Sequence, residues 1–173
     1  LRRNALLDDP DPRDGKAPMR ISLGCDHRGR KAIDELIPYL RGNGHEVVEL
    51  GIESPEDRSC DYPDRAWLVA NAVSRHDCDR GILVCGTGIG MCIAANKVAG
   101  VRAALALDEL SAKFSRSHND ANILCMSADM LGQTLLKRIV DTWMETPFDG
   151  GRHQRRVDKI HEIESGRDPS ELA

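Results

Sequence analysis

The chain of 173 residues has few aromatic side chains, two Trp, two Tyr and two Phe. It therefore lacks the stacking platforms that single-stranded nucleic acids require. Basic residues gather only at the extreme N-terminus and around 152–156, and the net charge is −4, which argues against a nucleic-acid-binding surface. No apolar run approaches the roughly 20 residues of a membrane-spanning helix. These absences argue against a nucleic-acid partner and against a membrane partner, and they favour a small-molecule ligand.

Spacing typical of a metal site or a disulfide framework is missing too. The six cysteines stand at positions 25, 60, 78, 85, 92 and 125, and no two of them form a Cys-x-x-Cys pair. We therefore expect reduced thiols, a cytoplasmic location and no bound metal. Apart from Cys85, these cysteines are most simply small core or surface residues.

Composition divides the chain into three parts. Residues 1–18 are polar, contain three prolines and show no periodicity, which predicts a disordered N-terminal extension. The ordered domain is expected over 19–166, with a flexible tail at 167–173. Apolar runs predict strands at 20–24, 46–50, 81–84, 101–105 and 122–126.

Helical periodicity separates these strands. The apolar spacing predicts buried helix faces formed by Ile33, Leu36, Ile37 and Leu40; by Ala66, Trp67, Ala70 and Val73; by Leu110 and Phe114; and by Leu135, Leu136, Ile139, Val140 and Trp143. Pro63 suits a first helical turn, whereas Pro38 is expected to kink or end its helix. A last helix over about 152–164 follows a Gly150-Gly151 hinge. Alternating strands and helices predict a single-domain α/β fold, a Rossmann-like three-layer sandwich with a five-stranded parallel sheet.

Residues 81–97 carry the strongest functional signal. A short apolar strand is followed by Cys85, by glycines at 86, 88 and 90, and by a helical run from Met91. Alternating glycines let several N–H groups point at one ligand, and a thiolate is favoured near a helix N-terminus. The loop lacks the Gly-Lys-Ser/Thr ending of a P-loop and the third glycine of a dinucleotide fingerprint. It predicts an anion-binding nest beside an activatable thiol.

Other polar residues are expected near the same edge of the sheet. Asp26 and His27 follow the first strand, and 117–120 precede the fifth in a loop expected to reach over that edge. Each has a simpler interpretation: Asp26 as a helix N-cap, His27 or His118 as a structural histidine, and the arginines of 152–156 as a solvated helix face.

Six segments, in order, resemble the family that contains ribose-5-phosphate isomerase B and the galactose-6-phosphate isomerase subunits. They are 24–29, 61–63, 85–90, 94–97, 118–122 and 150–156, and the resemblance extends from about 19 to 164.

The resemblance implies a cofactor-free aldose–ketose isomerase that moves a proton between C1 and C2 of a phosphosugar through an enediolate. Cys85 matches the base, with Thr87 assisting ring opening; His118 matches the ring-opening acid, with Asp26 beside it. The matching substrate-binding residues are His27, Tyr62, Gly86, Gly88, Ile89, Gly90, Asn119, Arg152 and Arg156. It also implies a homodimer, or a dimer of dimers, whose C-terminal helix is exchanged or packed at the interface, so that active sites are shared between chains.

One position departs from the family pattern. Asp129 stands where the resemblance implies an arginine, and a carboxylate cannot bind a phosphate. Ribose 5-phosphate is the substrate expected first, while four- and six-carbon phosphosugars stay open. A different class, a non-catalytic protein that binds a phosphometabolite, would need the glycines and arginines but not Cys85 with His118.

Overall fold

The protein forms an α/β fold around one parallel sheet. The computed structural model describes residues 17–51 and 60–172. In this part the sheet has the strand order β2-β1-β3-β5-β4, and each neighbouring pair is parallel. The strands are β1 (Arg20–Cys25), β2 (Glu46–Glu49), β3 (Arg80–Cys85), β4 (Ala103–Leu105) and β5 (Ile123–Ser127). The helices are α1 (Arg30–Gly42), α2 (Tyr62–Ser74), α3 (Ile89–Ala95), α4 (Glu109–Ser117), α5 (Gln133–Glu145) and α6 (Arg152–Glu164), followed by the 3-10 turn η2 (Pro169–Glu171).

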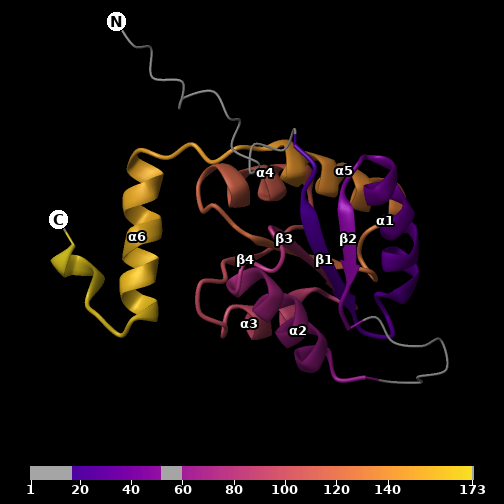
Figure 1. Cartoon of the computed structure of the whole chain (residues 1–173), viewed down its shortest axis with the longest axis horizontal. Helices are drawn as coiled ribbons and strands as arrows, with labels where there is room; N and C mark the ends of the chain where they lie inside the picture. Colours follow the sequence, from indigo (N-terminus) through magenta and orange to yellow (C-terminus); the bar gives the residue numbers. More distant parts are fainter. Residues whose placement is uncertain (1–16, 52–59, 173) are drawn as a thin grey trace, which may run out of the picture.

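Helices cover both faces of this sheet, which confirms the predicted three layers (Figure 1). Strand side chains alternate between the faces, so Ile82 and Val84 join one core and Leu83 and Cys85 join the other. The first core also contains the apolar sides of α1 and α5, and the second those of α2 and α3. Cys85 therefore faces the α2 and α3 side.

Three helical residues expected in the core lie at the surface instead. Trp67, Leu110 and Phe114 are 56%, 59% and 42% exposed. The α4 helix turns Ala112 and Arg116 toward the core, which leaves its larger apolar side chains outside. Periodicity identifies an apolar helix face, but it does not show whether this chain's own sheet covers it.

Pro38 neither ends nor interrupts α1. The helix continues to Gly42, with Pro38 on its exposed side. Pro63 lies in the first turn of α2, as predicted.

The α6 helix stands apart from the three layers at the end of an extended connection from α5 (Figure 1). Gly150 and Gly151 have φ of 61° and 53°, and this positive-φ pair turns the chain into α6. Of α6, only His153 and Val157 are buried, while Ile160 and Ile163 are 40% and 61% exposed.

The predicted domain boundaries stay predictions. Of the expected N-terminal extension, residues 1–16 lie outside the described residues. The segment expected as a flexible tail contains η2, and Lys159 Nζ donates to the carbonyls of Pro169 and Leu172, at 2.5 and 2.8 Å.

Candidate active site

Cys85 ends β3 at the carboxyl edge of the sheet. Its side chain is 4% exposed, and the backbone N–H of Gly88 donates a hydrogen bond to its Sγ over 3.1 Å. Such an N–H donor suits a sulfur that carries negative charge. The loop after β3 thus turns back on the thiol, which confirms its predicted strand–loop–helix setting.

The glycines of this loop lie in close contact with neighbouring elements. Gly88 has φ +75°, and a Cβ there would lie 2.6 Å from Leu105 Cδ1 and 2.9 Å from the Met126 carbonyl. A Cβ on Gly90 would lie 2.6 Å from Cζ of Tyr62, whose ring therefore covers this glycine from the start of α2. Thr87, also in this loop, is exposed and accepts from the N–H of Ile89 at 3.3 Å.

Asp26 shapes the neighbouring loop after β1. Its backbone N–H donates to the Val84 carbonyl at 3.3 Å, and its Oδ1 accepts from the N–H groups of Arg28 and Gly29, each at 3.0 Å. The buried carboxylate therefore orders the turn before α1, whereas the N-cap position of that helix is Gly29 and carries no side-chain cap bond. His27, which lies between Asp26 and Arg28 in this loop, is exposed.

Two residues whose contact the sequence analysis did not predict meet over Gly86. The Arg28 guanidinium binds the Asp129 carboxylate, with Nη2 2.8 Å from Oδ2. The bond raises the pKa of Arg28. Ser127, also missed, donates from Oγ to the Gly86 carbonyl at 2.6 Å and fixes the loop to β5. Arg28 and Asp129 are 101 residues apart in the sequence. Their opposite charges alone could not predict that these two residues pair.

His118 and Asn119 lie at the other edge of the sheet. The α4 helix starts after β4 and runs back toward the amino edge, where Asn119 and Asp120 contact Arg102 just before β4. Within one chain, segment 117–120 therefore does not reach over the edge that bears Cys85, contrary to the prediction. The sequence pattern could have predicted this position, because a crossover helix in a parallel sheet returns the chain to the amino ends of the strands.

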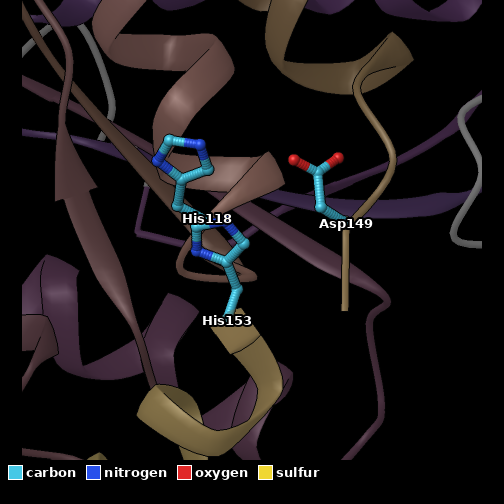
Figure 2. A group of neighbouring side chains, drawn as sticks. All are labelled: His118, Asp149 and His153. Atoms are coloured by element: carbon cyan, nitrogen blue, oxygen red, sulfur yellow. The ribbon is translucent and has the colours of Figure 1, made fainter. Parts of the chain in front are cut away.

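The start of α6 joins this second group. The Asp149 N–H donates to the Ser117 carbonyl at 3.0 Å, and the rings of His118 and His153 stack with centroids 4.2 Å apart (Figure 2). Arg152 and Arg156 are exposed on the same end of α6. Beside His118 opens a cavity of about 650 Å³, lined by Phe114, Asp149 and others.

His118, Asp149 and His153 offer ligand atoms within 4.8 Å of one another, the kind of cluster that can hold a metal ion. Their orientation does not suit this use, because the two imidazole planes are only 3° apart. Lone pairs in stacked parallel planes do not converge on one point. Burial lowers the pKa of His153, and His118, Arg152 and Arg156 lower it further.

The thiols of Cys92 and Cys125 form a coupled pair between α3 and β5. The interaction of the two sulfurs lowers the pKa of Cys92 and, together with burial, raises that of Cys125 well above its ordinary value. Burial raises the pKa of Cys25 to about 12. No disulfide joins the six cysteines, all of which lie in the described ranges, and no helix in those ranges is long and apolar enough to span a bilayer.

The predicted site residues therefore form two groups. Asp26, His27, Tyr62, Cys85 and the loop 86–90 lie at the carboxyl edge, and His118, Asn119, Arg152 and Arg156 lie at the other end of the molecule.

Known proteins show the same fold and sequence pattern. A family model described as Ribose/Galactose Isomerase matches residues 21–160. Ribose-5-phosphate isomerase B of Escherichia coli is 45% identical over 148 residues, 86% of this chain and 98% of that protein. The structure of Clostridium thermocellum ribose-5-phosphate isomerase B matches with a TM-score of 0.82 and 47% identity over 86% of this chain and 99% of that chain. The Mycoplasma genitalium ribose-5-phosphate isomerase B with bound ribulose-5-phosphate matches with a TM-score of 0.80 and 43% identity over 84% of this chain and 96% of that chain. The chain belongs to the Ribose/Galactose Isomerase family.

Proposed function

We propose that this protein interconverts ribose 5-phosphate and ribulose 5-phosphate, without a cofactor, with Cys85 as the base. The observation that carries the proposal is the buried Cys85 sulfur, which accepts the Gly88 N–H inside the glycine loop. A protein that only binds a phosphometabolite needs the loop but has no use for a thiol there. Family membership and the relatives named above support the same activity.

The chemistry follows from the position of the thiol. The Cys85 thiolate removes the proton from C2 of the open-chain aldose, which leaves an enediolate with its negative charge on O1. The proton of the C2 hydroxyl then passes to O1, and the Cys85 thiol returns its proton to C1, so the ketose forms and no electron acceptor is consumed. In between, negative charge develops on the sugar oxygen, where the N–H groups of residues 86–90 would stabilise it. Thr87 lies in this loop and would assist ring opening.

We further propose that the active site is completed by a second copy of the chain. His118, Asn119, Arg152 and Arg156 lie too far from Cys85 in one chain to share a substrate with it, since β-strands of five or six residues separate the two edges. The start of α6 presents the two arginines to solvent, and Ile160 and Ile163 are exposed on the same helix. A two-fold dimer would bring His118 as ring-opening acid, Asn119 for a sugar oxygen and both arginines for the phosphate to the partner's Cys85.

Free thiols support a reducing compartment, and we place the protein in the cytoplasm.

The direct test is a coupled assay over four-, five- and six-carbon aldose and ketose phosphates, with wild type and Cys85→Ala. Removing a general base costs about 10²–10⁴ in rate, and we expect at least this loss in kcat on ribose 5-phosphate. Cys78→Ala is the matched control, because Cys78 is also 4% exposed but precedes β3 at the amino edge. Near-normal kcat in Cys85→Ala would eliminate Cys85 as the base. If the wild type turned over only another phosphosugar, the proposed substrate would be wrong, whereas the proposed reaction, an aldose–ketose isomerisation, would stand.

A further inference from the structure

The Arg28–Asp129 ion pair lies directly over the glycine loop. Arg28 Nε is 2.9 Å from Asp129 Oδ2 and 3.2 Å from Oδ1. A Cβ built on Gly86 would lie 3.0 Å from Arg28 Cδ and Nε and 3.0 Å from Asp129 Oδ2. Both side chains therefore border the nest one residue beyond Cys85.

The ion pair holds the guanidinium in place and leaves some of its N–H donors unbonded. Asp129 engages Nε and Nη2, and within the described residues Nη1 makes no hydrogen bond or ion pair. The Arg28 side chain is 56% exposed, so the remaining N–H donors are open to a ligand. His27, next to Arg28 in the same loop, is exposed as well.

We propose that Arg28, oriented by Asp129, binds the phosphate of the substrate and thereby selects phosphosugars by length. This inference rests on the proposed isomerase function. A guanidinium fork matches phosphate oxygens, and a cation aligned by a carboxylate loses less freedom on binding. The separation between Arg28 and Cys85 is set by β1, β3 and the two loops that follow them, so it fixes the distance between phosphate and reacting carbons. Asp129, which stands where the resemblance implies an arginine, is then a positioning residue. Arg28 supplies the positive charge beside the glycine loop.

The test compares Arg28→Gln with a matched pair elsewhere on the surface. Arg41 binds Glu49 at 2.8 Å with side chains 52% and 43% exposed, against 2.8 Å, 56% and 39% for Arg28 and Asp129. The readouts are KM and kcat for ribose 5-phosphate and the dissociation constant of inorganic phosphate by calorimetry. Losing a charge-assisted hydrogen bond should raise KM and the phosphate dissociation constant about tenfold or more, with kcat within about threefold. Arg41→Gln should change neither.

A second set of variants changes Asp129. Arg28→Gln leaves an unpaired carboxylate beside the phosphate, so Arg28→Gln with Asp129→Asn should bind phosphate more tightly than Arg28→Gln alone. Asp129→Asn by itself should raise KM less than Arg28→Gln does, and the ratio of kcat/KM between five- and six-carbon phosphosugars should shift in both variants. Unchanged melting temperatures would show that these effects are local.

Several results would overturn the inference. A KM and a phosphate dissociation constant for Arg28→Gln within twofold of wild type would do so, as would a wild-type protein that binds no phosphate. If the wild type isomerises no phosphosugar but loses phosphate affinity on Arg28→Gln, the proposed function fails and Arg28 stands as an anion-binding residue.

Discussion

Replacing Gly88 by alanine tests the conformation of the loop that holds Cys85. Gly88 has φ +75°, and an added Cβ would lie 2.6 Å from Leu105 Cδ1 and 2.9 Å from the Met126 carbonyl, so backbone as well as side chain must move. A left-handed alanine costs about 1–2 kcal/mol, and overpacking costs about 1–3 kcal/mol more. We expect the free energy of unfolding to fall by about 2–5 kcal/mol, which lowers Tm by roughly 4–20 °C in a domain of this size.

The assay is unfolding in guanidinium chloride, followed by circular dichroism, with Gly90→Ala for comparison. A Cβ on Gly90 would meet the ring of Tyr62, whose side chain is 42% exposed and free to swing aside. Alanine is also the better helix former in α3, so this change should cost less than about 1 kcal/mol. A loss below about 1 kcal/mol for Gly88→Ala would refute the close approach of the loop to β5.

Two further predictions concern titrating side chains. The interaction with Cys125 lowers the pKa of Cys92, whereas burial raises that of Cys25, so iodoacetamide should label Cys92 in the native protein at a lower pH than an ordinary thiol and reach Cys25 only on unfolding. Peptide mapping by mass spectrometry checks this, and equal labelling of both thiols at pH 7 would contradict it. The folded pKa of His153 is lowered, so the unfolded chain binds the proton more readily. The associated stability is present above the unfolded pKa of about 6.5 and is lost as the pH falls through it. His153→Gln should therefore flatten the decline of Tm between about pH 7.5 and about pH 5.5; an unchanged slope would show that other groups carry it.

Local patterns predicted most of the elements because their causes are local. The predicted strands lie within two residues of the observed ones at either end, and the last helix has the predicted bounds, 152–164. The loop at 85–90 could be predicted because its three glycines alternate within six residues of sequence, and each meets a neighbour at short range.

The arrangement of the site depends on contacts that no local pattern encodes. The Arg28–Asp129 pair joins loops after β1 and β5, and only the strand order β1-β3-β5 puts those loops on either side of Gly86. The apolar spacing of Leu110 and Phe114 is that of a buried face, yet both are exposed in the chain alone. A second chain that covers such a face leaves the same periodicity as a sheet does.

The central claim is that Cys85 of one chain works with Arg152 and Arg156 of another, and mixed dimers test it most directly. Cys85→Ala and Arg156→Ala proteins, each inactive alone, would be unfolded together and refolded. Random assembly makes half of the dimers mixed, and each mixed dimer holds one intact site and one doubly damaged site. The account predicts recovery of about a quarter of wild-type activity. A mixture that stays inactive despite verified mixed dimers would show that both groups act within one chain and would contradict the shared site.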